Sequence, residues 1–304
     1  MNGSVFVTGG SGLLGVNWAA ALRERCAVAL GLHERTIVLR GVETRHNDLE
    51  SVEGLARLFE ETRCSLVVHT AGMTNVEACE SNPARAGHVN VQLPVNVATA
   101  CARLGIALAH ISTDHLFSGN NALMTENDPV TPMNVYGRTK AEAELRVLDA
   151  YPEAVVVRTN FYGWGPSYRR SFSDTIIAGL RKGERLSLFW DVTYTPILMD
   201  ALISAVHGLV ERKASGIFHV TGDDRLSKYD FGVRVARRFG LDEQLITRSS
   251  MAENPEFVKR PSTMTLSNRK ASSLLGRRLG GLDEHLALLQ RQEHSDAVKE
   301  IQSL

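Results

Sequence analysis

The sequence of 304 residues contains no long apolar run and no excess of one charge. None of its hydrophobic stretches approaches the ~20 residues that are needed to span a bilayer. The N-terminus has no basic segment followed by an apolar one, so we expect no secretory signal. Its 34 Lys and Arg residues balance its 34 Asp and Glu residues, so no global field attracts nucleic acid or a membrane surface. We therefore expect a cytoplasmic protein that binds neither.

Cysteine is also scarce. The four residues Cys26, Cys64, Cys79 and Cys101 are widely and irregularly spaced. They form no CxxC pair and no Cys/His cluster with the spacing of a zinc site. We interpret them as small apolar side chains in a reduced protein, and we predict no metal site.

Short apolar runs alternate with longer amphipathic stretches in the first half of the chain. The runs predict strands and the stretches predict helices, with Pro94 kinking the third helix or marking its true start. The runs are apolar throughout, as expected when helices cover both faces of a parallel sheet. The sequence therefore predicts an α/β fold with a Rossmann-type, doubly wound parallel sheet. The expected strands are 4–8, 27–32, 66–70, 107–111 and 154–158, and the expected helices are 13–25, 51–62, 84–104 and 135–150.

This rhythm changes after Arg158. Residues 160–173 are rich in aromatic and turn residues, which is typical of a loop that crosses the mouth of a site. We expect residues 1–160 to form the Rossmann domain, with the chain returning to it around 195–220. Residues 161–304 are expected to form mainly a smaller, C-terminal α/β domain. Its expected elements are helices at 172–182, 199–211 and 229–239, a strand at 216–220 and a helical segment at 282–304.

A glycine-rich turn follows the first predicted strand, where Gly9, Gly12 and Gly15 form a GxxGxxG pattern. Glycine lets the backbone approach a pyrophosphate, and the N-terminus of the next helix directs free N–H groups at it. A glycine-rich turn without a ligand is the alternative. Because this turn is the first strand–helix connection, it favours a dinucleotide. The other cofactor candidates in the turn are Ser11, Leu13 and Leu14.

The end of the second strand normally contacts the adenosine ribose of a dinucleotide. This chain has His33, Glu34 and Arg35 there. A carboxylate repels a 2′-phosphate, whereas Arg35 and His33 can receive one. We therefore favour NADP and keep NAD as the alternative; three solvated loop residues are the reading without a ligand.

Tyr136 and Lys140 form a YxxxK pattern inside the predicted helix 135–150, so the phenol and the ammonium share one helix face. A cation within roughly 4–6 Å stabilises a phenolate, so we expect Lys140 to lower the pKa of Tyr136. Tyr136 can then exchange a proton with a carbonyl oxygen. Thr113 follows the strand 107–111 and can offer a hydroxyl to the same oxygen. The alternatives are a chance match on an amphipathic helix and, for Thr113, a turn residue.

These motifs occur in a familiar order. TGGSGLLG, HTAG, STDHLF and YGRTK resemble the extended short-chain dehydrogenase/reductases. The segments NVYGRTKAEAE, RTNFYG, TPILMDAL and KRPSTMTLSNRKASSLLG are similar to the dTDP-4-dehydrorhamnose reductase family. They also resemble a relative of that family, the regulatory β subunit of methionine adenosyltransferase. The resemblance covers most of residues 3–276.

The resemblance implies roles for individual residues. Thr113, Tyr136 and Lys140 would be catalytic, and Lys140 would also bond the nicotinamide ribose. Arg260 would lie near a nucleotide-sugar, with an ordinary surface salt bridge as the alternative. No metal would take part. The further cofactor positions are Asp48 and Leu49 beside the adenine, Ala71, Gly72 and Met73 after the fourth strand, and Asn90 in the helix behind the site.

Two positions depart from that family's pattern. His115 stands where its reductases usually have tyrosine, and Thr159-Asn160-Phe161 replaces an RTSW-like run. Both positions are expected to touch the sugar, so His115 and Phe161 are candidate substrate contacts and the sugar stays open. His115 is alternatively a structural residue. The aromatic side chains of this region either stack on a sugar or base or close the edge of a core; they are Phe161, Tyr162, Trp164 and Tyr168.

The resemblance implies an NAD(P)H-dependent oxidoreductase of carbohydrate biosynthesis that reduces a nucleotide-linked 4-keto-6-deoxy sugar. Tyr136 would donate the proton and Thr113 would help to stabilise the oxyanion. One alternative is an epimerase or dehydratase that retains its NAD and returns the hydride. Another is a non-catalytic, NADP-binding regulatory subunit. A homodimer is a further expectation from the resemblance.

Overall fold

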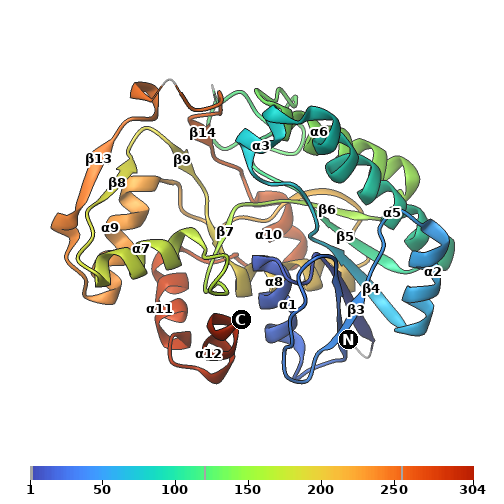
Figure 1. Cartoon of the computed structure of the whole chain (residues 1–304). Helices are drawn as coiled ribbons and strands as arrows, with labels where there is room; N and C mark the ends of the chain where they lie inside the picture. The colour runs from blue at the N-terminus through green and yellow to red at the C-terminus, as the bar shows by residue number, and fades with distance from the viewer. Residues whose placement is uncertain (1–2, 120, 255) are drawn as a thin grey trace.

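The computed structural model describes residues 3–119, 121–254 and 256–304. A seven-stranded parallel sheet lies in the right half of Figure 1, in the order β11-β6-β5-β4-β1-β2-β3. Helices cover both of its faces, which confirms the predicted Rossmann-type fold. The strands are β1 (Ser4–Thr8), β2 (Val28–Leu32), β3 (Glu43–His46), β4 (Cys64–His69), β5 (Ala107–Ile111), β6 (Val155–Arg158) and β11 (Gly216–His219).

Strand β1 explains why its apolar run is continuous. Val5 and Val7 pack into the core on one face of the sheet, and Phe6 packs into the core on the other. All three side chains are fully buried, because successive residues of a strand point to opposite faces. One helix layer consists of α1 (Leu13–Leu22), α8 (Met199–Glu211), α10 (Arg269–Leu275) and α12 (Asp296–Ser303), and the other of α2 (Val52–Glu61), α5 (Leu93–Leu104) and α6 (Val135–Ala150).

The predicted helix 84–104 is three segments. It consists of α4 (Pro83–Gly87), a π-helical turn (His88–Gln92) and α5, and it follows the short helix α3 (Val76–Ser81). Pro94 lies in the first turn of α5, where the missing N–H of proline breaks no helical hydrogen bond. Pro94 therefore marks where α5 begins, directly after a π-helical turn and within a stretch of continuous helical backbone.

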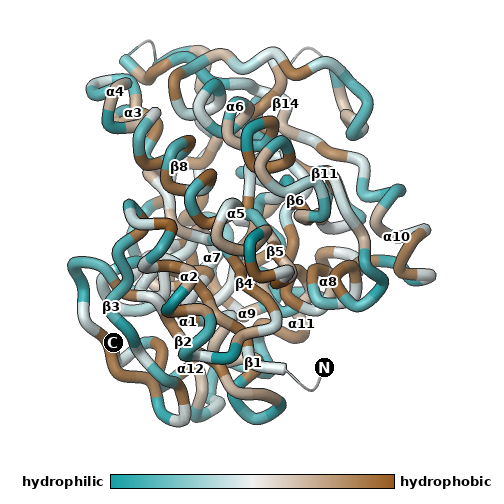
Figure 2. The backbone as a smooth tube through the Cα atoms, turned by 90° about the vertical axis from the view of Figure 1, so that its right-hand side faces the viewer, coloured by the Kyte–Doolittle hydropathy of each residue, from teal (hydrophilic) through white to brown (hydrophobic). Residues whose placement is uncertain are grey.

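Strand β3 was not predicted. Its four residues ETRH are all hydrophilic and mostly exposed, and the tube is teal there in Figure 2. It pairs with β2 alone at the edge of the sheet. An edge strand that faces water carries no apolar pattern, so periodicity gave no signal.

After β6 the chain enters a smaller unit, at the left of Figure 1. Its strands pair as β7 with β10, β8 with β13, and β12-β9-β14. Their core contains Tyr162, Tyr194 and Phe231, whose rings meet edge to face. The elements are β7 (Phe161–Tyr162), α7 (Phe172–Arg181), β8 (Leu186–Phe189), β9 (Thr193–Tyr194), β10 (Ile197–Leu198), β12 (Leu226–Ser227), α9 (Lys228–Phe239), a 3₁₀ turn (Glu243–Leu245), β13 (Ile246–Ser249), a second 3₁₀ turn (Met251–Glu253), β14 (Thr263–Met264) and α11 (Leu282–Gln292).

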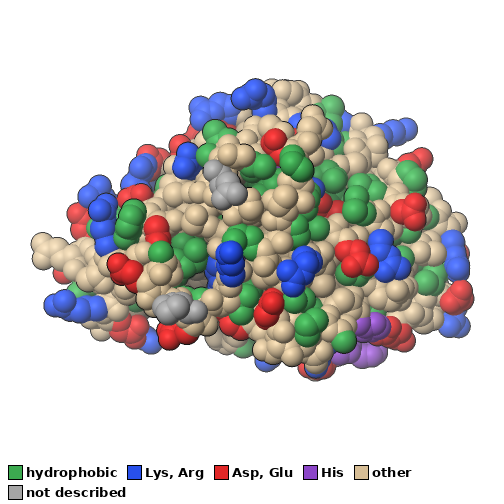
Figure 3. Space-filling view, turned by 90° about the horizontal axis from the view of Figure 1, so that it is seen from above, with side chains coloured by type: hydrophobic (Ala, Val, Ile, Leu, Met, Phe, Trp, Pro, Cys, Tyr) green, Lys and Arg blue, Asp and Glu red, His purple; other side chains and the backbone are tan. Residues whose placement is uncertain are grey.

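The surface carries no large area of one charge on the face that Figure 3 shows, where acidic and basic side chains alternate. In the described part of the chain, no helix combines the length and the apolar character that a membrane crossing requires.

Candidate active site

The glycine turn brings three segments of backbone into close contact. Gly9 has a φ of +67°, and a Cβ atom there would lie 2.7 Å from the amide nitrogen of Ala71. A Cβ at Gly15 would lie 2.6 Å from the carbonyl oxygen of Gly9. Helix α1 has Gly12 as its N-cap, with no side-chain cap and no acidic residue in its first turn. No side chain therefore accepts a hydrogen bond from the first N–H groups of α1. A helix start of this kind suits an anion.

A cavity of about 610 Å³ extends from this turn to the YxxxK motif. A second cavity of about 760 Å³ shares Ala71 and Gly72 with it and continues toward the end of β2. Gly15 and Arg260 line neither cavity. The predicted residues that line the first are Gly9, Ser11, Gly12, Leu13, Leu14, Arg35, Ala71, Gly72, Asn90, Thr113, His115, Tyr136, Lys140 and Phe161, and the second adds His33, Asp48, Leu49 and Met73.

Asn90 holds the backbone on one wall of the first cavity. Its side chain accepts from the amide of Met73 (2.8 Å) and donates to the carbonyl of the same residue (3.0 Å). It also donates to the hydroxyl of Thr139 on α6 (3.1 Å). Asn90 therefore links the segment after β4 to the helix that carries Tyr136.

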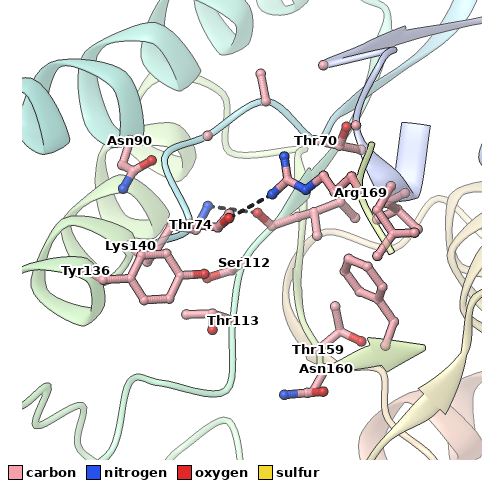
Figure 4. Close-up of a pocket in the computed structure, with 18 of the residues that line it drawn as sticks. Thr70, Thr74, Asn90, Ser112, Thr113, Tyr136, Lys140, Thr159, Asn160 and Arg169 are labelled. Carbon is pink, nitrogen blue, oxygen red and sulfur yellow. Dashed lines mark hydrogen bonds between the residues drawn. The ribbon is translucent and has the colours of Figure 1, made fainter. Parts of the chain in front are cut away.

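Helix α6 starts beside the cavity because Asn134 caps it. The Asn134 side chain accepts from the amide of Gly137 (2.9 Å) and donates to the carbonyl of Lys259 (3.0 Å). Tyr136 therefore lies in the first turn of the helix, and Figure 4 shows its ring close to Lys140, Ser112 and Thr113. The His115 ring contacts the ring of Tyr136 edge to face, with 5.6 Å between centroids.

Lys140 is held from behind by the strand β5. Its Nζ donates to the carbonyl of Ile111 (2.8 Å) and lies 3.4 Å from Nε2 of His110. Burial lowers the pKa of Lys140 to about 8, against the opposing effect of the carboxylate of Glu144. An ammonium has three N–H donors, so one remains for a ligand in the cavity.

The expected effect of Lys140 on Tyr136 is wrong for this structure. Burial raises the pKa of the Tyr136 phenol to about 12, and hydrogen bonding by Thr113 offsets this rise only in part. Lys140 directs its ammonium to the carbonyl of Ile111, and desolvation is the largest influence on the phenol. The phenol is therefore protonated at neutral pH, which suits a proton donor.

A buried ion pair supports the segment after β5. Arg158 on β6 donates from Nε and Nη2 to the carboxylate of Glu144 on α6, at 2.7–3.0 Å. Both side chains are almost fully buried. Ser112 donates to the same carboxylate at 2.5 Å, so the pair fixes the residue next to Thr113. Glu144 was not selected from the sequence, although it follows Lys140 by four residues on one helix face.

Three comparisons place this architecture among known proteins. A family model described as the RmlD substrate binding domain matches residues 3–293. The chain belongs to this family. A probable low-salt glycan biosynthesis reductase of Haloferax volcanii is 31% identical over 289 residues, covering 94% of this chain and 96% of the relative.

Further proteins are similar to this chain in sequence or in structure. A dTDP-4-dehydrorhamnose reductase of Mycobacterium tuberculosis is 32% identical, over 67% of this chain and 69% of its own length. The methionine adenosyltransferase 2 subunit beta of Rattus norvegicus is 26% identical, over 89% of this chain and 82% of the relative. The solved structure of a Bacillus anthracis dTDP-4-dehydrorhamnose reductase in complex with NADP superposes with a TM-score of 0.84, at 23% identity, over 96% of this chain and 100% of that one. The resemblances to the dTDP-4-dehydrorhamnose reductase family and to the methionine adenosyltransferase β subunit are thereby confirmed.

The aromatic segment of this RmlD-family chain divides into two groups. Tyr162 and Trp164 are buried in the smaller core, and Trp164 donates to the carbonyl of Leu289 (3.0 Å). Phe161 and Tyr168 line the first cavity instead. Tyr162 and Trp164 thus close the edge of a core, whereas Phe161 and Tyr168 remain candidates for contact with a ligand.

Arg260 lies outside the two cavities. Its guanidinium pairs with Glu77 and donates to the carbonyl of Val258 (3.1 Å). The salt bridge named as the alternative for Arg260 is thus present in this structure. Thr159 and Asn160, from the run expected to touch the sugar, also line the first cavity. The cavity includes further residues that were not selected from the sequence, namely Thr70, Thr74, Val76, Ile111, Ser112, Asp114 and Arg169.

Proposed function

We propose that this chain is an NADPH-dependent reductase of a nucleotide-linked 4-keto-6-deoxy sugar, similar to dTDP-4-dehydrorhamnose reductase. One observation carries the proposal: Tyr136, Lys140 and Thr113 line the same cavity as the glycine turn. Reductases among the curated relatives support the same reaction class.

The glycine turn fits a dinucleotide. Side chains at Gly9 or Gly15 would collide with backbone atoms, and the uncapped start of α1 offers N–H groups to phosphate oxygens. The Bacillus anthracis neighbour is described with NADP, which favours NADP, with NAD as the alternative. When bound, a nicotinamide cofactor supplies the hydride that the ketone carbon receives.

The residues at the other end of the cavity handle the proton. The Tyr136 phenol, protonated at neutral pH, gives its proton to the ketone oxygen as the carbonyl is reduced. The Thr113 hydroxyl donates a hydrogen bond to the same oxygen and stabilises its developing charge. Lys140 uses its remaining N–H to bind the cofactor's ribose beside Tyr136.

The division of labour between the two units belongs to the same proposal. Residues 1–160, with the chain returning to the large sheet around 195–220, bind the dinucleotide. Residues 161–304 mainly bind the sugar, with Phe161, His115 and Arg260 as contacts or neighbours of the substrate. A cytoplasmic homodimer is the proposed working form.

A substrate panel tests the function. Nucleotide-linked 4-keto sugars are each mixed with the purified protein and NADPH or NADH, and oxidation of the cofactor is followed. The proposal predicts oxidation of NADPH with at least one such sugar and formation of the reduced sugar. Redox-neutral conversion with cofactor retained through purification would select the epimerase or dehydratase instead. NADPH binding without turnover of any sugar would select a regulatory role, which the similarity to the methionine adenosyltransferase subunit makes the second candidate.

A further inference from the structure

A segment of the smaller unit runs along the first cavity and contacts the glycine turn. We call residues 163–170 the strap. Tyr168 donates from its hydroxyl to the carbonyl of Ser11 (2.8 Å), and Asn17 on α1 donates to the carbonyl of Trp164 (2.8 Å). A Cβ atom at Gly165 would lie 3.0 Å from a methyl group of Leu13. The strap therefore lies directly against the turn that is proposed to hold the pyrophosphate.

Arg169 reaches across the cleft from the strap. Its Nη2 donates to the hydroxyl of Thr74 at 3.0 Å, as the dashed line in Figure 4 shows. Thr74 belongs to the segment after β4, on the side of the cleft opposite the smaller unit. Arg169 and Thr74 both line the first cavity, so this contact bridges the space above the glycine turn.

Arg35 approaches the same place from the loop after β2. Its guanidinium carbon lies 4.0 Å from the centroid of the Tyr168 ring, in a cation–π contact. That contact directs Arg35 into the first cavity, whereas His33 and Glu34 line the second cavity with Asp48 and Leu49. The position of Arg35 thus favours the middle of a bound dinucleotide over its ribose 2′-phosphate.

The charges in the first cavity are unbalanced. Its charged lining residues are Arg35, Asp114, Lys140 and Arg169, and Asp114 is engaged by Asn160 (2.8 Å). No ion pair among the described residues includes Arg35 or Arg169. Two guanidinium groups without a carboxylate partner, next to a helix N-terminus, form a site for a doubly charged anion.

We propose that Arg35 and Arg169 clamp the pyrophosphate of the cofactor, so that the dinucleotide is held by both units of the protein. This inference rests on the proposed function. Tyr168 orients the clamp, since it contacts Arg35 through its ring and Ser11 through its hydroxyl. The strap residues thereby become part of the cofactor site, although they come from the unit assigned to the substrate.

Cofactor binding tests the clamp without any turnover. The dissociation constants of NADPH and NADH are measured by titration calorimetry for the wild type, Arg35→Gln, Arg169→Gln and Arg170→Gln. Arg170 is the matched control, because it is the neighbouring exposed arginine and lines neither cavity. Loss of a charge-assisted phosphate contact weakens binding by about tenfold or more. We expect this loss in Arg35→Gln and Arg169→Gln, by the same factor for NADPH and NADH, and no change in Arg170→Gln.

Comparing NADPH with NADH distinguishes a pyrophosphate clamp from a contact with the 2′-phosphate. If Arg35→Gln weakened NADPH and left NADH unchanged, Arg35 would bind the 2′-phosphate and the clamp would be wrong. If both variants bound both cofactors as tightly as Arg170→Gln does, neither arginine would contact the pyrophosphate. If the wild type bound neither dinucleotide, the proposed function itself would fail, a result that differs from failure of the clamp alone.

Discussion

The two ends of the first cavity are made from different parts of the chain. At the glycine turn the surface is largely main chain, because Gly9 and Gly15 lie where a Cβ atom would collide with backbone atoms. At the YxxxK end the surface is side chain, contributed by α6 and by the segments that follow β5 and β6. In the proposed function, main-chain N–H groups recognise a group that all dinucleotides share, whereas the side-chain end selects the carbonyl compound that reacts.

The side-chain end also contains buried polar atoms that have no hydrogen-bond partner among the described residues. Thr159 and His115 line it, and Oγ1 of Thr159 and Nδ1 of His115 are buried with no hydrogen-bond partner among the described residues. Buried polar atoms of this kind are rare unless something else satisfies them. A ligand with hydroxyl groups would supply those hydrogen bonds. We therefore expect the side-chain end to select among sugars, whereas the glycine turn accepts any dinucleotide.

The largest expected effect comes from removing the proton donor. Tyr136→Phe keeps the ring and its contact with His115, but it leaves the ketone oxygen without a proton. Turnover should fall by roughly 10²–10⁴-fold, as is common when a general acid is lost. The measurement is kcat with the best sugar of the panel, and Tyr151→Phe on the same helix's C-cap is the control. A kcat within threefold of wild type, at about the same KM, would remove Tyr136 from the chemistry.

The next largest effect is expected on stability, from breaking the buried ion pair between Arg158 and Glu144. Arg158→Met leaves the carboxylate of Glu144 buried without its partner, which should lower the free energy of unfolding by about 3–5 kcal/mol. The double variant Glu144→Met with Arg158→Met removes both charges and should recover most of that loss. Chemical denaturation measures all three proteins. Equal destabilisation of the single and double variants would mean that packing, rather than charge, sets the cost.

The pH dependence sharpens the contrast, because Lys140 at the side-chain end loses its charge as the pH rises through about 8. Below its pKa of about 8 Lys140 is charged, so kcat/KM should be constant near pH 7 and fall about tenfold per pH unit well above 8. Stability should respond in the opposite direction. An unfolded lysine keeps its proton to about pH 10.4, so between these values the unfolded chain binds more protons and the free energy of unfolding rises with pH. A pH–rate profile with no decrease above pH 8 would contradict the assignment.

The smallest effect is expected from removing the hydroxyl of Thr159, which has no hydrogen-bond partner among the described residues. Thr159→Val removes a buried hydroxyl that bonds nothing among the described residues, so stability should change by less than about 1 kcal/mol. If the hydroxyl contacts the sugar, KM should rise by about tenfold. Thr221→Val is the control, since its hydroxyl does donate, to the carbonyl of Leu266 (3.4 Å), and should affect stability without affecting KM. An unchanged KM in Thr159→Val would show that the sugar lies elsewhere.

The same contrast explains what the sequence could predict. Gly9, Gly12 and Gly15 are readable because a tight strand–helix turn demands glycine at fixed spacing, and Tyr136 with Lys140 because helix periodicity puts them on one face. Predicted strands and helices with strong apolar patterns were confirmed, including 107–111 and 135–150. Each of these features is local in the sequence.

The missed features depend on contacts between distant segments. Arg169 meets Thr74 across 95 positions of the chain, and no local pattern signals that pairing. Strand β3 is polar because it lies at the sheet edge. The pKa of Tyr136 was misjudged because spacing shows the neighbouring cation but not the burial of the phenol, which dominates.

The most direct test of the central claim compares NADPH affinity after a change at each end of the cavity. In Gly12→Val the new side chain would contact one backbone atom, the carbonyl oxygen of Gly9 at 3.0 Å from its Cβ, and would otherwise occupy space that a pyrophosphate needs. We predict that Tyr136→Phe binds NADPH as the wild type does, while a folded Gly12→Val has lost that binding. If Gly12→Val folded and bound NADPH unchanged, the glycine turn would not be the cofactor site and the central claim would be contradicted.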